Sequence, residues 1–183
     1  MSRIPLEHRQ TPMVRFVQWV NRRKFGAQLD PGLVALHNRR VLLTMALTES
    51  TVTRWKSLDP TLTALATMGP AALIGCSWCL DFGYWEHHHR GVPAEKLRAV
   101  SNWRDSDVYT DLERKVLAYA EAMTVTPPQV TDEMVEQLRA ELTDEQVVEL
   151  TAMIALENQR SRNNAAAGLT GQGFKEQCEL RPA

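Results

Sequence analysis

Apolar residues recur along this chain every three to four positions, the period that gives an α-helix one buried face. Alternation of apolar and polar residues, which indicates a strand, never extends beyond a few positions. The pattern therefore predicts an all-α protein. In the first third of the chain, helices are expected over 13–26 with Gly26 as the stop, over a short stretch after the turn in LDPGLVALHN, and over 39–55.

Capping signals divide the rest of the chain into further helices. A helix is expected to begin at Asp59-Pro60 and to kink or break at Gly69-Pro70, because an interior proline costs about 3 kcal/mol. The next helix is expected from about Ser77 to Arg90, with Gly91 at its C-cap, and the short helix VPAEKLRAV follows. Three more helix starts are marked by Thr110 with Glu113, by Thr131, and by Thr143 with Gln146.

No internal repeat, low-complexity tract or linker interrupts this pattern, so one domain overall is expected. Within it we assign residues 1–57 to N-terminal helices that pack on the core and residues 58–174 to the helical core. Residues 175–183 are expected to form a flexible tail.

Composition narrows the classes of partner. The 183 residues carry 21 basic and 22 acidic side chains, and the net charge of −1 gives no electrostatic case for a nucleic-acid or membrane partner. No apolar run reaches the roughly 18 residues of a membrane span, and no secretory signal is evident near the start. We therefore expect a cytoplasmic protein whose three cysteines are kept reduced.

Two of the cysteines form a CxxC motif in the stretch GCSWCLDFGYWEHHHRG, residues 75–91. On a helix Cys76 and Cys79 lie about 60° apart on one face, close enough to form a disulfide. If the helix begins near Ser77, its terminal amides favour the thiolate, the attacking species in peroxide reduction and disulfide exchange. Three interpretations stay open here: a redox pair, a metal site, or two buried cysteines that pack as small apolar residues.

A metal site at this pair has the least support. His87 follows Cys79 by eight residues, about 12 Å along a helix axis, whereas zinc holds its ligands at about 2.0–2.3 Å. The run His87-His88-His89 points in three directions around a helix, so a solvated or subunit-contact patch is the simpler interpretation. We expect no metal ligand here and no cofactor.

The motif and its surroundings resemble a known family. An all-helical chain with GCSWCLD, a glycine twelve residues after the second cysteine, and a short PAEKL helix is similar to the carboxymuconolactone decarboxylase and alkylhydroperoxidase-D-like family. The stretch ENQRSRNNAAAGLTGQGF extends the resemblance, which covers roughly Leu58 to Phe174. It implies an alkylhydroperoxidase-D-like helical bundle that forms a homo-oligomer, as a trimer, hexamer or dimer.

The resemblance also implies a chemistry for the cysteine pair. In the redox branch, the thiol at the position of Cys79 attacks a hydroperoxide and the one at the position of Cys76 resolves it. A lipoyl-type or other dithiol partner then reduces the disulfide. The decarboxylase branch does not depend on such a pair, so the two cysteines favour the redox branch.

The chain departs from that branch at the two residues that relay the proton. Gly83 stands where the branch has a histidine four residues after the second cysteine, and Ala64 stands where it has a glutamate twelve residues before the first. Glu86 and His87 are auxiliary candidates on the cysteine face of the helix, although they lie about 10–12 Å down its axis from Cys79.

Other carboxylates are weaker candidates. Asp81 points about 160° away from Cys79 on a helix. Glu49 and Glu157 are on other helices and could fold against the pair, but a solvated position is the simpler expectation for each. The polar run 157–164 indicates either a polar interface or pocket wall, or a helix that emerges into solvent.

Two further features have competing interpretations. The aromatic residues of the CxxC helix could line an apolar pocket, but core or subunit packing explains them equally simply; they are Trp78, Phe82, Tyr84 and Trp85. Cys178 is expected to be an incidental exposed thiol, with a third redox partner as the alternative.

The sequence thus predicts a thiol-dependent, peroxidase-like oxidoreductase with peroxiredoxin-type activity. Gly83 and Ala64 favour one alternative, an oligomeric helical protein of the same fold without peroxidase chemistry. The other alternative is a lactone decarboxylase-type enzyme whose acid or base the sequence does not identify.

Overall fold

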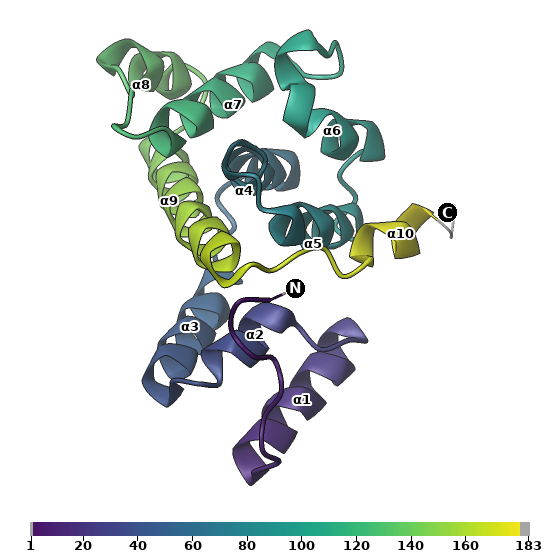
Figure 1. The fold of residues 1–183 in the computed structure, drawn as a ribbon. Helices are drawn as coiled ribbons and strands as arrows, with labels where there is room; N and C mark the ends of the chain where they lie inside the picture. Colours follow the sequence, from purple (N-terminus) through teal and green to yellow (C-terminus); the bar gives the residue numbers. More distant parts are fainter. Residues whose placement is uncertain (1, 180–183) are drawn as a thin grey trace. The chain divides into compact units, whose positions relative to one another are not determined.

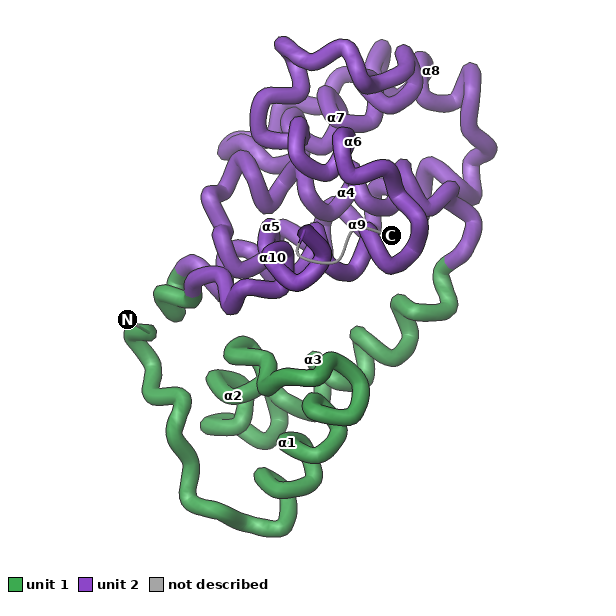
Figure 2. The backbone as a smooth tube through the Cα atoms, turned by 90° about the vertical axis from the view of Figure 1, so that its right-hand side faces the viewer, with its two compact units in different colours: residues 1–55, 166–169 green, residues 56–165, 170–183 purple. Residues whose placement is uncertain are grey.

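The computed structural model describes residues 2–179, and this part of the chain contains helices and turns but no strand, so the all-α prediction is confirmed. The chain divides into two compact units (Figure 2). The first comprises residues 1–55 with 166–169, and the second comprises 56–165 with 170–183. The boundary falls two residues before the one expected at 57/58, and the packing of the N-terminal helices on the core stays a prediction.

The first unit contains three helices around a small core of its own: α1 (Pro12–Phe25), α2 (Asp30–Ala35) and α3 (Arg39–Val52). Gly26 ends α1 in the left-handed conformation with φ of 71°, as its position in the sequence predicts. The buried centre of this core is formed by Val14, Leu33 and Leu36.

The second unit carries the cysteine motif and is built around one buried helix, α4 (Pro60–Ile74). The remaining helices of this unit are α5 (Ser77–His88), α6 (Ala94–Ala99), the 3₁₀ helix η1 (Val100–Asp105), α7 (Asp111–Thr124), α8 (Asp132–Arg139), α9 (Asp144–Ala167) and α10 (Phe174–Glu179). Figure 1 shows α4 at the centre with α5, α6, α7 and α9 around it, and α8 and α10 further out.

The predicted helix starts are confirmed by their caps. Thr110 and Glu113 form a capping box at α7, and the Thr131 hydroxyl accepts from Met134 N at α8. At α9, the Gln146 backbone donates to the Thr143 hydroxyl while the Gln146 side chain accepts from the Thr143 N–H.

The break expected at Gly69-Pro70 does not occur, because α4 continues through Pro70 to Ile74. This helix is apolar on nearly all sides and packs against both α5 and α7. At Gly69 an added Cβ would lie 3.4 Å from Leu117 Cδ2, so the glycine allows a close approach to α7. The burial gained along α4 offsets the hydrogen bond that the proline removes.

The C-terminal segment is helical where a flexible tail is expected from residue 175. Residues 174–179 form α10, and Phe174 and Cys178 are buried in the second unit. Residues 180–183 of the expected tail lie outside the described residues. Within the described range, no helix has the length and apolar character needed to cross a membrane.

Candidate active site at the Cys76–Cys79 disulfide

The cysteine pair lies at the N-terminus of α5, which begins at Ser77 as predicted. Cys76 is the N-cap residue, and it forms a disulfide with Cys79 across a Cα–Cα distance of 5.3 Å. The Cys76 sulfur also accepts a hydrogen bond from the Cys79 backbone N–H at 3.2 Å. When the pair is reduced, this amide and the helix dipole favour a thiolate at Cys76.

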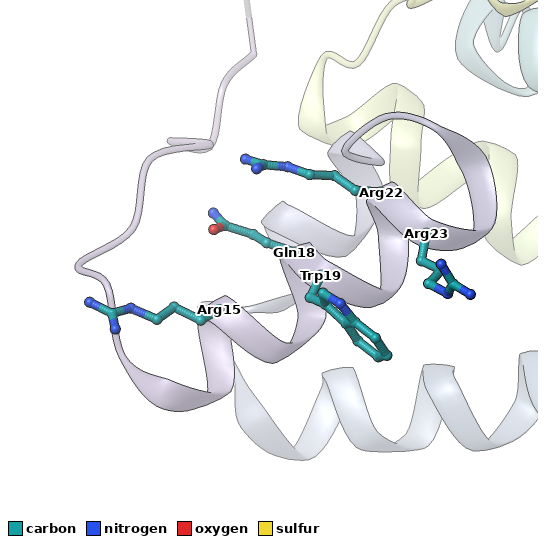
Figure 3. Close-up of a pocket in the computed structure, with 5 residues that line it drawn as sticks. All are labelled: Arg15, Gln18, Trp19, Arg22 and Arg23. Carbon is teal, nitrogen blue, oxygen red and sulfur yellow. The ribbon is translucent and has the colours of Figure 1, made fainter.

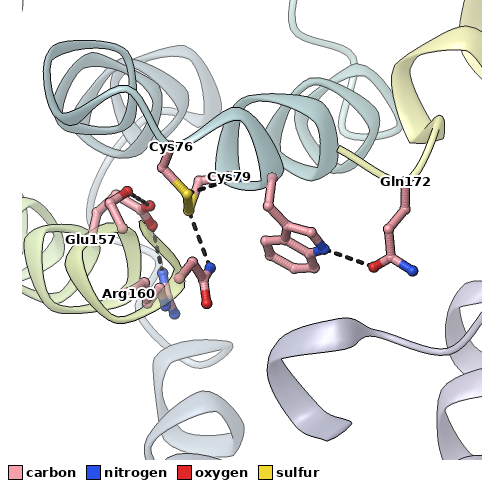
Figure 4. The surroundings of a disulfide bond; sticks show 8 residues. Cys76, Cys79, Glu157, Arg160 and Gln172 are labelled. Atoms are coloured by element: carbon pink, nitrogen blue, oxygen red, sulfur yellow. Dashed lines mark hydrogen bonds and ion pairs between the residues drawn. A yellow bond between two sulfur atoms is a disulfide. The ribbon is translucent and has the colours of Figure 1, made fainter. Parts of the chain in front are cut away.

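The second sulfur has a donor from a different helix. The side-chain amide of Asn164, on α9, donates to Cys79 Sγ at 3.3 Å, and both residues are buried (Figure 4). A hydrogen bond to a sulfur favours its charged form over its neutral form. Each cysteine therefore has one N–H donor of its own.

Asn164 belongs to a buried polar stripe on α9 together with Glu157 and Ser161. These three residues follow the i, i+4, i+7 spacing of one helix face. The Ser161 hydroxyl donates to Glu157 Oε1 at 2.7 Å, and the Arg160 guanidinium lies 3.5 Å from Glu157 Oε2. Figure 4 shows the Glu157 side chain pointing toward the cysteine pair. Glu157 is 5% exposed, so the expectation of a solvated carboxylate is wrong.

The same spacing decides between the two interpretations of the polar run 157–164. Its members at 157, 161 and 164 continue the buried face that Leu150 and Ile154 begin, so the run forms a wall of the cysteine site. Arg162 and Asn163 lie between them and are exposed. Helical periodicity applied to polar residues alone could have identified this face, because it is the period that identifies an apolar one.

The structure shows what replaces the missing relay histidine. Gly83 is buried, and a Cβ added there would lie 3.3 Å from Met68 Cγ of α4. Met68 is itself buried, so any side chain at position 83 would require it to shift. Ala64, at the other relay position, is fully buried in α4.

The two auxiliary candidates on α5 occupy different environments. Glu86 pairs with Arg90 at 2.6 Å, and both side chains are substantially exposed. His87 is buried, with Nε2 at 2.8 Å from Thr67 Oγ1, while Nδ1 has no hydrogen-bond partner within residues 2–179. Burial, and then the positive charges of Arg90 and Arg160, lower the pKa of His87 to about 3. His87 is therefore neutral, and it is not part of a solvated histidine patch.

The remaining carboxylate candidates are Asp81, on α5, and Glu49, in the first unit. Asp81 faces away from the cysteines, as helical geometry predicts, and its carboxylate accepts backbone N–H groups from Gln172, Phe174 and Lys175 at the start of α10. Glu49 is an exposed residue of α3 in the first unit.

Packing accounts for the aromatic side chains of α5. Phe82 lies between Trp78 and Trp85, with ring centroids 5.1 and 5.5 Å away, and it is perpendicular to the Phe174 ring of α10 at a centroid distance of 5.3 Å. The Trp78 indole N–H donates to Gln172 Oε1 at 2.7 Å. These contacts join α5 to the C-terminal segment.

Cys178 is a buried free thiol, not the exposed one expected from the sequence. Burial and the nearby carboxylates of Glu179 and Asp81 raise its pKa. A thiol of this kind is a weaker nucleophile at neutral pH than one at a helix N-terminus.

A surface groove of about 460 Å³ lies along α1 in the first unit (Figure 3). All of its lining residues come from that single helix: Arg15, Gln18, Trp19, Arg22 and Arg23. None of these side chains is a nucleophile, so the groove provides no group for the cysteine chemistry.

The chain is similar in sequence to a known family and to known proteins. The profile of the Carboxymuconolactone decarboxylase family matches residues 42–122, which include both cysteines. The protein YnjA of Escherichia coli is 33% identical over 179 residues, which is 95% of this chain and 93% of YnjA.

Solved structures show the same fold. A protein of unknown function from Agrobacterium tumefaciens, described as a candidate antioxidant defence protein AhpD, is 26% identical. It has a TM-score of 0.69 over 75% of this chain and 94% of its own. A variant of the debrominase Bmp8, in complex with 2,3,4-tribromopyrrole, has a TM-score of 0.80 over 97% of each chain. At 20% identity, that second likeness concerns the fold alone.

We predict that His87 makes the protein less stable in acid. Its folded-state pKa of about 3 lies below the unfolded value near 6.5, so the unfolded chain takes up the proton first. This contribution to stability is fully present above about pH 6.5 and is lost as the pH falls toward 3, by about 1.4 kcal/mol per pH unit. Urea unfolding of the oxidised protein in metal-free buffer, followed by circular dichroism at several pH values, measures it.

His87→Gln is the variant that isolates this effect. Its free energy of unfolding should fall less steeply with decreasing pH than that of the unmodified protein, whatever its stability at neutral pH. Equal slopes for the two proteins would contradict the buried, neutral state of His87.

Proposed function

Because this chain belongs to the carboxymuconolactone decarboxylase family and has a buried CxxC pair on an alkylhydroperoxidase-D-like helical bundle, we propose that it is a thiol-dependent peroxidase. The single observation that carries the proposal is the Cys76–Cys79 pair itself, because each of its sulfurs has a separate N–H donor inside a shielded site. Such donors stabilise the thiolates that peroxide chemistry requires.

The proposed cycle has three steps. The thiolate of Cys79 attacks the terminal oxygen of a hydroperoxide, the O–O bond breaks, and the alkoxide leaves and takes up a proton to become an alcohol. The product on the enzyme is a sulfenic acid at Cys79. The Cys76 thiolate then attacks that sulfur, releases water after proton uptake, and forms the disulfide. A dithiol reductant restores both thiols by exchange and is itself oxidised to a disulfide.

Exposure supports the assignment of Cys79 as the attacking thiol. Cys79 is 8% exposed and Cys76 only 1%, so a peroxide has better access to Cys79. The amide of Asn164 provides the donor that Cys79 needs as a thiolate. Cys76 has the helix amide, which suits a resolving thiol that must also react as a thiolate.

Glu157 is the group that we assign to proton transfer. It is the buried carboxylate on the α9 face that contacts Cys79 through Asn164, and Ser161 and Arg160 hold it in place. A carboxylate in a shielded site can receive the thiol proton and return it to the departing alkoxide. Glu157 would then carry out the proton transfer for which the redox branch uses a histidine and a glutamate at the positions of Gly83 and Ala64.

The proposal also defines the partners. The substrate is a hydroperoxide, and the electron donor is a lipoyl-type or other small dithiol. No cofactor is required, because the sulfur atoms carry the electrons themselves. A reductant of this kind fits the cytoplasmic location expected from the sequence.

Two alternatives to the peroxidase remain. Gly83 and Ala64 support a family member without this chemistry, and a lactone decarboxylase-type reaction would proceed without either cysteine.

We predict that Cys79 becomes a sulfenic acid when the resolving thiol is removed. Reduced Cys76→Ser protein, treated with a hydroperoxide and then with a sulfenic-acid trapping reagent, should carry the adduct at Cys79 in mass spectrometry. The reduced unmodified protein should lose two of its three free thiols and keep Cys178 titratable, because a disulfide consumes both members of the pair.

Cys79→Ser serves as the matched control for the trapping experiment and should show little adduct at Cys76. A folded, reduced protein that keeps all three thiols in the presence of hydroperoxide would exclude the peroxidase. Turnover of a lactone acid by a protein without either cysteine would then favour the decarboxylase-type alternative.

A second prediction concerns Glu157. The Glu157→Gln variant keeps the shape and the hydrogen bond from Ser161 but loses the proton acceptor, so the rate of peroxide-driven thiol oxidation should fall by about 10²–10⁴. Stopped-flow tryptophan fluorescence of the reduced protein measures this rate. The control is Glu86→Gln on the exposed surface of α5, which should retain the original rate. Equal losses in both variants, or in neither, would remove Glu157 from the mechanism.

We propose further that the protein is a homo-oligomer and that the first unit provides a subunit contact. The helices of the first unit expose several large apolar side chains: Phe16 is 63%, Trp19 61% and Leu47 65% exposed. Leu43 and Val41 on α3 are also exposed. Large apolar surfaces of this kind commonly become buried between subunits.

We predict that Leu47→Glu shifts the protein toward smaller species, because a carboxylate in an apolar contact must be desolvated. Light scattering after size-exclusion chromatography gives the mass of the unmodified protein and of the variant. Gln137→Glu adds the same charge at an exposed polar position on α8 and should leave the mass unchanged. A monomeric unmodified protein would contradict the homo-oligomer.

A further inference from the structure

Three side chains that the proposed peroxidase does not use converge at the far end of α5. His88, the last residue of this helix, and His89, its C-cap, meet Cys178 of α10, and one ligand atom from each lies within 4.8 Å of the other two. His88 is half-buried, His89 is exposed, and Cys178 is buried. All three belong to the second unit. The position lies at the opposite end of α5 from the disulfide.

We propose that His88, His89 and Cys178 bind a zinc ion that ties α10 to the C-terminal end of α5. Imidazole nitrogen and thiolate sulfur are the donors that zinc prefers in proteins. Three protein ligands leave the fourth tetrahedral position to a water molecule. The separation along one helix axis that disfavours zinc at the CxxC pair does not apply here, because the thiolate comes from a different helix, α10.

The tautomer of His89 fits this role. Its Nδ1 lies 2.7 Å from the Trp85 carbonyl oxygen, and a carbonyl only accepts, so Nδ1 carries the proton. The lone pair is therefore on Nε2, the atom left to face a metal. A ligating histidine typically donates its other N–H to a carbonyl or carboxylate in this way, which fixes the orientation of the ring.

His88 is also held in place by its neighbours. Its ring stacks on Tyr84 with a centroid distance of 5.9 Å and an interplanar angle of 12°, and Tyr84 is almost fully buried. The stacking limits rotation of the imidazole and keeps it on the side of α5 that faces α10. Both histidines are thus oriented without a metal, which lowers the entropy that binding must overcome.

Cys178 is positioned by a network that begins at Asp81. The Asp81 carboxylate accepts backbone N–H groups from Gln172 at 2.6 Å, Phe174 at 3.1 Å and Lys175 at 2.8 Å, and so fixes the start of α10. Phe174 packs on Phe82 and Trp85 of α5. One turn later, Cys178 lies on the same helix face as Phe174 and is brought to the two histidines.

The separations suit a metal after a small adjustment. Zinc–nitrogen distances of about 2.0–2.1 Å and zinc–sulfur distances of about 2.3 Å place tetrahedral ligand atoms about 3.3–3.6 Å apart. Ligand atoms separated by the 4.8 Å limit therefore have to approach one another by about 1.2–1.5 Å. His89 is exposed, so its ring can shift toward Cys178 without displacing a buried side chain, provided that the hydrogen bond of Nδ1 to the Trp85 carbonyl adjusts with it. On binding, the Cys178 S–H bond breaks, the sulfur bonds to zinc, and the proton goes to solvent.

The experiment uses the full chain with the Cys76–Cys79 disulfide closed, so that Cys178 is the free thiol available to a metal. Cobalt(II) serves as the spectroscopic probe, because a cobalt–thiolate bond gives a charge-transfer band and tetrahedral coordination gives intense visible bands. One equivalent of cobalt should produce both signals, and one equivalent of zinc should remove them. Zinc should also raise the melting temperature.

Variants distinguish the ligands from the surroundings. Cys178→Ser should lose the charge-transfer band, and His88→Gln and His89→Gln should each weaken zinc binding by more than the roughly 10–100-fold typical for loss of an outer partner. His37→Gln, an exposed histidine of the first unit, is the control and should bind zinc as before. Competition with a chromophoric chelator measures the affinities.

Three results would overturn the proposal: no charge-transfer band in the folded oxidised protein, a band that persists in Cys178→Ser, or equal zinc affinity in the His37 and His89 variants. Each is separate from the peroxidase test, which monitors the other two cysteines in metal-free buffer. Failure of one proposal therefore leaves the other intact.

Discussion

The cysteine site depends on one constraint: a carboxylate that is buried must have its hydration replaced by contacts within the protein. The Glu157 carboxylate is buried in α9, and such a group is tolerated only where hydrogen bonds and an opposite charge replace its hydration. Ser161, one turn later, provides the hydrogen bond, and Arg160 provides the charge. Because these partners lie on α9 itself, the helix can present Asn164 to Cys79 on the same face without any loop. The hydrogen bond at the Cys79 sulfur therefore depends on this polar face of α9.

Local signals in the sequence predicted most of the helices, and in several cases their ends. Gly26, the capping boxes at Thr110 and Thr143, and the start of α5 at Ser77 were all evident, because each depends on residues within one turn. The polar run 157–164 was recognised as unusual, but whether its side chains face the protein interior or solvent was left undecided. The structure decides this, and the 3.6-residue spacing of the polar members would have done so as well.

The failures of prediction came from contacts between distant residues. Asp81 caps a helix that starts more than 90 residues later, and this contact orders the segment expected to be flexible. Cys178 is buried for the same reason. Pro70 was expected to interrupt α4, but the packing of Gly69 against α7 outweighs the local preference. No propensity scale contains these contacts, because they arise only when helices far apart in sequence meet.

The fold alone does not determine the reaction, since a debrominase shares it over nearly its whole length. The difference must lie in a few side chains, and here the space beside α5 is already occupied. A Cβ at position 83 would already lie 3.3 Å from Met68 Cγ. A larger side chain at position 83 thus requires Met68 to shift, and we expect relatives to covary there: a bulky residue at 68 with glycine at 83, or a small residue at 68 with a histidine at 83.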